Sequence, residues 1–193
     1  MNLFSQIAKV YRQRWFYLAA LIALGAPVGR AAAASDMGLE YRIKAAYLYN
    51  FTKFIEWPPP ATPNASFVLG VVDPDGFAYN IVRESVNGKT MPNGRAIVVR
   101  RLISLEADAT TCNQIFVTRS SGLDVAQIRK TLEGLPIVVV GETAGFAEQG
   151  GVIGFVLTGD AVHCEINLAG AQRAGVKLSG RLASIARLVH EIR

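Results

Sequence analysis

Side chains that could catalyse a reaction or bind a metal are few in this sequence. It has two histidines, His163 and His190, and two cysteines, Cys112 and Cys164. His163 alternates with Val162 and Cys164 in a run typical of a strand, which places it on the solvent-facing side, and His190 is three residues from the C-terminus. No His-x-x-x-His, Cys-x-x-Cys or clustered carboxylate pattern supplies metal ligands. The sequence therefore predicts neither a metal site nor a cofactor.

No nucleophile or phosphate-binding loop can be recognised either. Ser120 and Ser121 would need a neighbouring base and an orienting group, and no strand-to-helix elbow surrounds them. The glycines of residues 141–145 follow a predicted strand, where phosphate loops lie, but they lack both dinucleotide and P-loop spacing. We expect residues 145–151 to form backbone turns with positive φ instead. With no catalytic residue to assign, we predict that the protein is not an enzyme.

Trp57 is a candidate for contact with another protein. It precedes three prolines and ends a predicted helix rich in aromatic residues, so it could act as a rigid docking anchor. The simpler interpretation is that it seals the core where the first helix meets the first strand, and both roles remain open. The candidate partner-binding residues are Phe51, Phe54 and Trp57, together with Arg187 in a predicted C-terminal helix.

The two thiols could be free or bridged. Cys164 shares one face of its predicted strand with Val162 and Ile166, which is typical of a buried small residue. An exported protein can form disulfides, but sequence cannot place Cys112 and Cys164 within bonding distance. We favour two free thiols over a Cys112–Cys164 bridge.

Apolar periodicity predicts the elements of an α/β domain. Helical spacing covers residues 39–55, 77–86, 125–132 and 168–174, and a last helix starts near residue 180. Strand patterns cover residues 67–72, 95–101, 114–118, 137–140, 152–157 and 161–166. Strands that alternate with helices, followed by a hairpin, predict a single domain with a mixed sheet of about six strands and helices on both faces.

The N-terminus is typical of an export signal. Lys9, Arg12 and Arg14 precede an apolar stretch over residues 15–26, which is too short to span a bilayer. Pro27 and the alanines of residues 31–34 follow, and they offer small-residue cleavage sites. We predict a cleavable signal peptide over residues 1–34, cut after Ala33 or Ala34, and a mature periplasmic domain over residues 35–193.

The predicted cleavage changes the meaning of the charge. The whole chain has a net charge of +5, with 20 Lys and Arg against 15 Asp and Glu. Four of the basic residues and none of the acidic ones lie in the signal, so the mature chain keeps 16 basic and 15 acidic residues. The positive charge is therefore no argument for a nucleic-acid partner.

Three segments resemble the YfiR-like (HmsC-like) periplasmic family in the right order, over about residues 40–186. The first runs from Lys44 to Pro58 (KAAYLYNFTKFIEWP), the second includes Gly145-Phe146-Ala147 and Gly150-Gly151-Val152-Ile153, and the third runs from Glu165 to Ser179. Gly154 and Cys164 depart from the family's usual asparagine and aromatic residue. Well-studied relatives have a cysteine near Gly70 suited to pair with one at Cys112, so the resemblance implies that this bridge is missing here.

The resemblance implies a regulatory role. Such proteins bind the periplasmic sensor domain of an inner-membrane diguanylate cyclase and repress it, which limits cyclic-di-GMP synthesis and biofilm formation. An OmpA-like outer-membrane lipoprotein can sequester the repressor, and the fold is often seen as a dimer. The alternative that the sequence leaves open is a small-molecule-binding periplasmic sensor that feeds a histidine kinase or transporter.

Overall fold

The structure is a computed structural model that describes residues 28–60, 62 and 65–192. Most of the predicted signal peptide lies outside the described residues. The chain divides into two compact units, residues 1–38 and residues 39–193, and the second contains the α/β domain. No helix in the described part of the chain is long and apolar enough to cross a membrane.

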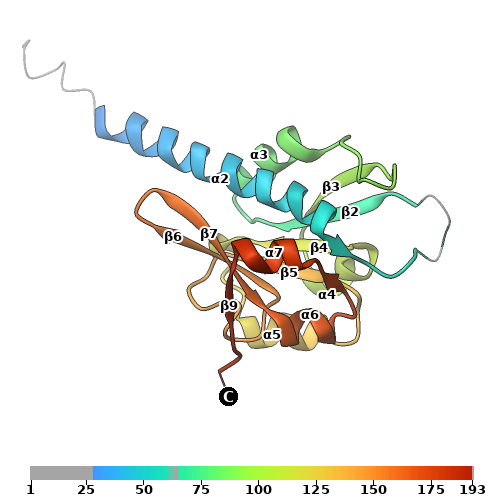
Figure 1. Ribbon diagram of the computed structural model, residues 1–193. Helices are drawn as coiled ribbons and strands as arrows, with labels where there is room; N and C mark the ends of the chain where they lie inside the picture. The colour runs from blue at the N-terminus through green and yellow to red at the C-terminus, as the bar shows by residue number, and fades with distance from the viewer. Residues whose placement is uncertain (1–27, 61, 63–64, 193) are drawn as a thin grey trace, which may run out of the picture. The chain divides into compact units, whose positions relative to one another are not determined.

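Within the described residues, seven strands form one mixed sheet in the order β3-β2-β4-β5-β6-β7-β9 (Figure 1). The strands are β2 (Phe67–Val72), β3 (Ile97–Leu102), β4 (Gln114–Val117), β5 (Val138–Gly141), β6 (Ile153–Thr158), β7 (Ala161–Asn167) and β9 (Arg187–Val189). The strands from β3 to β6 are parallel, β7 is antiparallel to β6, and β9 is parallel to β7. The fold class predicted from the sequence is confirmed.

The connections reverse direction between β2 and β4. From β2 the chain passes through a helix to β3 on one side, and then crosses back to β4 on the other side of β2. The carboxyl ends of β2 and β4 therefore flank a topological switch point, the place where doubly wound sheets commonly bind ligands.

Helices cover both faces of the sheet (Figure 1). Their bounds are α2 (Val28–Phe54), α3 (Phe77–Val86), α4 (Leu105–Asp108), α5 (Val125–Thr131), α6 (Leu168–Arg173) and α7 (Gly180–Ile185). On one face, Phe51 of α2 is buried and its ring stacks on that of Phe155 in β6, with centroids 6.1 Å apart. On the other face, α5 and α6 line a cavity together with Ile137 and Val139.

The N-terminal helix differs from the prediction. It begins at Val28 instead of residue 39 and continues through the alanines of residues 31–34, among them the predicted cleavage residue Ala34. Alanine is the strongest helix former, so this run extends the helix toward the N-terminus. A helix over these residues neither supports nor contradicts cleavage after Ala33 or Ala34, so the signal peptide stays a prediction.

The C-terminal segment is the clearest error of the sequence prediction. Ser179 caps α7 as its position suggested, accepting a hydrogen bond from the amide of Leu182. The helix ends at Ile185, however, and Arg187 lies in strand β9, opposite Glu165 of β7. The prediction of a terminal helix that carries Arg187 was wrong, because pairing with the open edge of β7 takes the last residues into the sheet.

A second, two-stranded sheet was also missed. It pairs β1 (Ile55–Glu56) with β8 (Lys177–Leu178) in antiparallel fashion, directly after α2 ends. Its partners are more than a hundred residues apart in sequence, so no local pattern predicts the pairing.

The glycine-rich segment between β5 and β6 holds an aromatic ring. Gly145 and Gly150 have φ of 68° and 107°, which confirms the expected turns. Phe146 is 1% exposed, and its ring lies against two further glycines. A Cβ atom on Gly141 or Gly151 would lie 2.2 Å from a carbon of this ring. Gly141 and Gly151 therefore leave room for the buried ring of Phe146.

Candidate functional site

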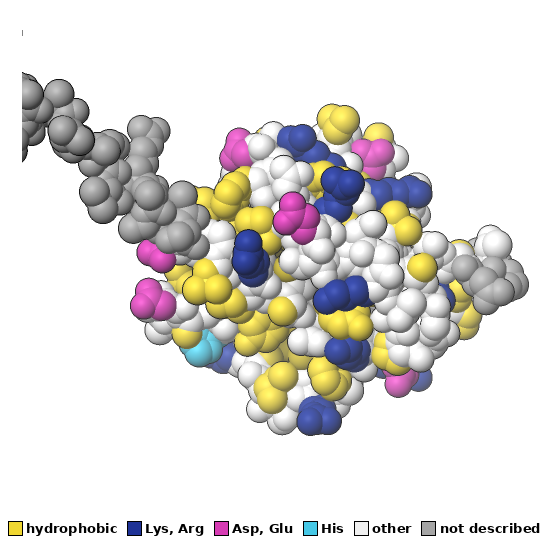
Figure 2. Space-filling model, turned by 90° about the horizontal axis from the view of Figure 1, so that it is seen from above, with side chains coloured by type: hydrophobic (Ala, Val, Ile, Leu, Met, Phe, Trp, Pro, Cys, Tyr) yellow, Lys and Arg dark blue, Asp and Glu magenta, His cyan; other side chains and the backbone are white. Residues whose placement is uncertain are grey.

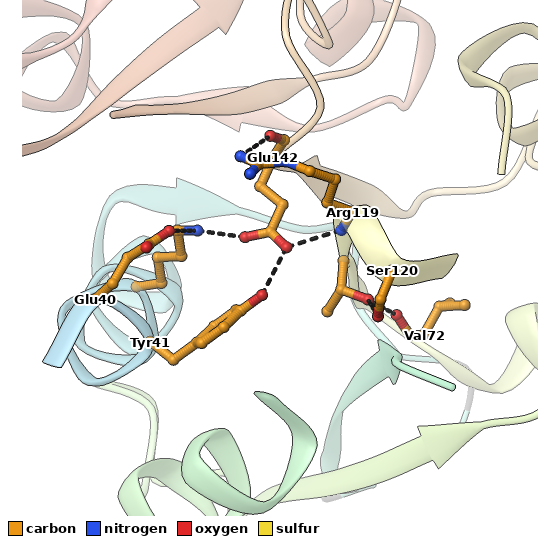
Figure 3. Close-up of polar contacts among 8 residues, drawn as sticks. Glu40, Tyr41, Val72, Arg119, Ser120 and Glu142 are labelled. Atoms are coloured by element: carbon orange, nitrogen blue, oxygen red, sulfur yellow. Dashed lines mark hydrogen bonds and ion pairs between the residues drawn. The ribbon is translucent and has the colours of Figure 1, made fainter. Parts of the chain in front are cut away.

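A buried ion pair occupies the carboxyl end of the parallel strands. Glu142 directly follows β5, and Lys44 reaches it from α2. The Nζ atom of Lys44 donates to Oε2 of Glu142 and to Oε1 of Glu40, one helical turn earlier (Figure 3). The Lys44 and Glu142 side chains are only 3% and 2% exposed. The helix therefore places its own cation where a ligand of such a sheet would bind.

Hydrogen bonds satisfy the rest of the Glu142 carboxylate. Its Oε1 atom accepts the Tyr41 hydroxyl at 2.9 Å and the Arg119 backbone N–H at 2.8 Å (Figure 3). Burial, and then the negative charge of Glu142, raise the pKa of Tyr41 well above its usual range. Tyr41 therefore stays protonated and remains a hydrogen-bond donor. The cluster links α2, β5 and the turn after β4 into one closed unit.

A second carboxylate lies next to it, directly after β2. Asp73 accepts the backbone N–H of Tyr79 through Oδ2 at 2.9 Å, at the start of α3, and the Ser120 hydroxyl through Oδ1 at 3.2 Å. The Ser120 hydroxyl also lies 3.0 Å from that of Thr118. Within the part of the chain that the structure describes, the Ser120 hydroxyl thus bonds to a carboxylate and a hydroxyl, and not to the imidazole that would activate a nucleophile.

These contacts clamp α2 onto the carboxyl ends of the parallel strands. Among the residues that the structure describes, no group of three His, Cys, Asp or Glu side chains could hold a metal ion.

The structure separates the predicted partner-binding residues. Phe51 is 1% exposed and belongs to the core. Phe54 and Trp57 are partly buried at the end of α2 and just after it. Trp57 donates its indole N–H to the Asn113 carbonyl at 2.9 Å and packs edge-on against Phe67, with centroids 4.8 Å apart. Both contacts are within the domain, as expected of a tryptophan that seals the core where the first helix meets the first strand.

Arg187 is exposed but not available as a free cation. Its guanidinium donates to the buried carboxylate of Glu165 and lies 3.7 Å from that of Glu148. It therefore fixes β9 to the sheet. Among the described residues, no hydrogen bond, ion pair or cation–π contact links Arg187 to the three aromatic candidates.

Both cysteines are buried and free. Burial raises the pKa of Cys164 from 9.0 to about 12, and it also raises the pKa of Cys112. Since the thiolate is the reactive form, we expect both thiols of the native protein to react slowly with DTNB at pH 8 and rapidly after unfolding in urea. Fast reaction of two thiols in the native state would contradict the burial.

The raised pKa of Cys164 also predicts a pH dependence. The unfolded thiol loses its proton near pH 9, whereas the folded one keeps it up to about pH 12. This contribution to stability is present below pH 9 and is lost as the pH rises toward 12. We therefore expect the variant Cys164→Val to lose less thermal stability than the wild type between pH 8.5 and 10.5, as measured by circular dichroism. Parallel curves for the two proteins would contradict the prediction.

Gly70 lies next to Cys112 across the sheet. A Cβ atom on Gly70 would lie 2.9 Å from Sγ of Cys112, about the separation found within a disulfide, and 2.7 Å from Cδ1 of Leu102. We expect Gly70→Cys to form a disulfide with Cys112 once Leu102 shifts. The bridge would close a loop of roughly 40 residues and stabilise the domain by up to about 4 kcal/mol. Non-reducing mass spectrometry and melting with and without reductant measure this, and Gly70→Ser controls for the steric cost.

The face of the sheet opposite α2 contains a cavity of about 870 Å³ between α5 and α6. Apolar side chains such as Ile128, Ile137 and Val139 line it together with Arg129 and Arg173. Both arginines bind Glu191 of the C-terminal segment, at 2.5 and 2.7 Å. A cavity of this volume is large enough for a small organic ligand. Sequence analysis missed it, because its walls come from segments that are distant along the chain.

Comparisons with known proteins identify one matching family and two structures with a similar fold. A family model described as YfiR/HmsC-like matches residues 41–187. Two solved structures are similar at a TM-score of 0.49: the ABC domain in complex with L-Trp from Streptococcus pneumoniae, at 13% identity, and a conserved domain protein from Vibrio cholerae, at 10% identity. The matches cover 66% and 77% of this chain, but only 58% and 59% of those two chains.

Proposed function

The chain belongs to the YfiR/HmsC-like family, and from this premise we propose that it is a periplasmic regulatory protein that binds and represses the sensor domain of an inner-membrane diguanylate cyclase. It would thereby limit cyclic-di-GMP synthesis and biofilm formation. The family match over residues 41–187, which is nearly the whole α/β domain, is the observation that carries this proposal.

The closed switch point supports binding over catalysis. Lys44 and Tyr41 of α2 fill the place where a substrate of a doubly wound sheet would enter, and Glu142 holds them there. A repressor needs only a higher affinity for one state of the cyclase than for the other, and a rigid exposed surface is sufficient for that. Export through a signal peptide over residues 1–34 is part of the same proposal.

Direct binding and inhibition test the proposal. The mature domain, residues 35–193, is titrated against the purified periplasmic domain of a membrane diguanylate cyclase from the same organism. It is then added to vesicles that expose that domain of the full-length enzyme. We expect binding below about 10 μM and slower cyclic-di-GMP synthesis. Failure to bind at 10 μM, with both proteins folded, would refute the proposal. An OmpA-like outer-membrane lipoprotein that competes for the domain would release the inhibition.

The cavity between α5 and α6 favours a second candidate function. In this second function, the domain is a sensor that binds a small molecule in the 870 Å³ cavity and passes the signal to a histidine kinase or a transporter. A thermal-shift screen of amino acids, nucleotides and small organic acids separates the two functions. Stabilisation by one compound, removed by filling the cavity with Ala174→Phe, would favour the sensor.

A further inference from the structure

The outward face of α2 is a row of unpaired cations set among aromatic rings. Arg42, Ala46, Tyr49 and Lys53 follow one another along one side of the helix at spacings of four, three and four residues. Lys89 joins this row from the turn after α3, and Arg181 joins it from α7. We call Arg42, Tyr49, Lys53, Phe54, Lys89 and Arg181 the α2 face.

The cations of the α2 face lie over its rings. The ammonium groups of Lys53 and Lys89 are 4.4 and 4.7 Å from the centroid of the same Tyr49 ring, and the Arg181 guanidinium is 5.9 Å from that of Phe54. Two like charges therefore converge on one ring. In the described part of the chain, none of the four cations of the α2 face forms an ion pair.

What distinguishes the α2 face is the convergence of cations on aromatic rings, with two ammonium groups over the single Tyr49 ring. On other elements, Arg129 and Arg173 share the carboxylate of Glu191, and Arg187 pairs with Glu165 of β7. On the side seen in Figure 2, Lys and Arg side chains lie among hydrophobic ones, with a few Asp and Glu side chains between them. The four cations of the α2 face give this part of the surface a local positive charge that a carboxylate-bearing partner can meet.

We propose that the α2 face is a docking surface for an acidic protein, whose carboxylates bind Arg42, the Lys53–Lys89 pair and Arg181. This rests on the proposed function, in which the acidic protein is the periplasmic domain of the cyclase. The small side chain of Ala46, in the middle of the row, lets the partner approach the helix closely.

The same features argue against other occupants. A second copy of the chain related by a twofold axis would bring the cations of one α2 face against the same cations of the other. A membrane surface would require apolar side chains that project outward, whereas the rings of Tyr49 and Phe54 are partly buried and lie beneath the cations. Carboxylates of a folded partner satisfy the unpaired charges without either cost.

Charge reversal tests the docking surface. The variant Arg42→Glu/Lys89→Glu is compared with Arg100→Glu/Lys130→Glu, which makes the same change in net charge. Arg100 and Lys130 are exposed, and their elements place them on the side of the sheet opposite α2. The two double variants and the wild type are titrated against the cyclase periplasmic domain at 50 and 300 mM NaCl. We expect the α2-face variant to bind on the order of tenfold more weakly at low salt, with a smaller salt dependence, and the control variant to bind like the wild type.

Each other outcome has a definite meaning. Equal binding by both double variants would overturn the α2 face and leave the proposed function in place. If the wild type does not bind the cyclase domain, the proposed function fails, and poly-L-glutamate becomes the probe: a loss of binding confined to Arg42→Glu/Lys89→Glu would support an acidic partner, and equal binding would overturn it. The same variants are also tested for binding to phosphatidylglycerol vesicles. If Arg42→Glu/Lys89→Glu loses binding only to these vesicles, the α2 face binds a membrane surface and the proposed protein partner is overturned.

Discussion

Replacement of Lys44 by methionine is expected to destabilise the domain by about 3–5 kcal/mol, because it leaves the Glu142 carboxylate charged and buried without its cation. Methionine keeps most of the volume of the lysine stem, so little of the loss comes from packing. Glu142 retains its hydrogen bonds from Tyr41 and from the Arg119 backbone, and these should allow the variant to fold. Urea unfolding followed by circular dichroism measures the change.

Two further variants make the cause identifiable. Lys53→Met removes a cation from the same helix at an exposed position without an ion pair, and should change the unfolding free energy by less than about 0.5 kcal/mol. The double variant Lys44→Met/Glu142→Gln removes both buried charges but keeps an acceptor for Tyr41 and Arg119, so it should recover at least half of the loss. If Lys44→Met cost no more than Lys53→Met, the ion pair would not be the clamp that holds α2.

Local sequence signals predicted those elements whose cause is local. Strand β2 and helix α3 have the predicted bounds, since an apolar β-branched run and the turn at residues 73–76 define them. Asp124 and Ser179 directly precede the predicted starts of α5 and α7, and both cap these helices. Such a cap is a local feature, because it acts on amides two or three residues away. Short strands were missed for the opposite reason. Strand β9 has three residues, too few for a period, and exists because β7 offers it an edge.

The candidate site was the least predictable part, because long-range pairing creates it. Lys44 belongs to the segment that carries the family resemblance, yet nothing in the sequence indicates that its partner is Glu142, 98 residues later. The sequence placed Glu142 in a weak phosphate-loop candidate after a strand. A usable signal was the position itself: an acidic residue at the carboxyl end of a central parallel strand lies at the edge where such sheets gather their polar groups.

Two glycines in and beside the second family segment have a structural role that the sequence does not show. Gly141 and Gly151 come from the end of β5 and from the residue two before β6, and together they leave room for one phenylalanine ring. A helix usually joins two parallel strands and covers their face, but none lies between β5 and β6. The buried ring of Phe146 takes over part of that function, so the segment needs both its phenylalanine and its glycines.

This dependence predicts strong coupling between Gly141 and Phe146. Phe146→Ala should destabilise the domain by about 3–5 kcal/mol, because it empties a buried site. Gly141→Ala should cost about 1–3 kcal/mol, because the new Cβ would lie 2.2 Å from the ring and the ring must move. The double variant should cost no more than Phe146→Ala alone, because the atoms nearest the new Cβ all belong to that ring. The coupling energy should therefore equal or exceed the whole cost of Gly141→Ala.

Equilibrium unfolding in urea of the four proteins in this cycle measures the coupling. Gly180→Ala, at a position where a Cβ would meet no atom within 4 Å, serves as the control and should change stability by less than about 0.5 kcal/mol in either background. Gly151, the other glycine against the Phe146 ring, should behave differently from Gly141. A Cβ there would also lie 2.8 Å from the backbone oxygen of Phe146, which truncation of the ring does not remove, so Phe146→Ala should rescue Gly151→Ala only in part. Additive costs at Gly141 and Phe146 would mean that the ring is not what the glycine accommodates.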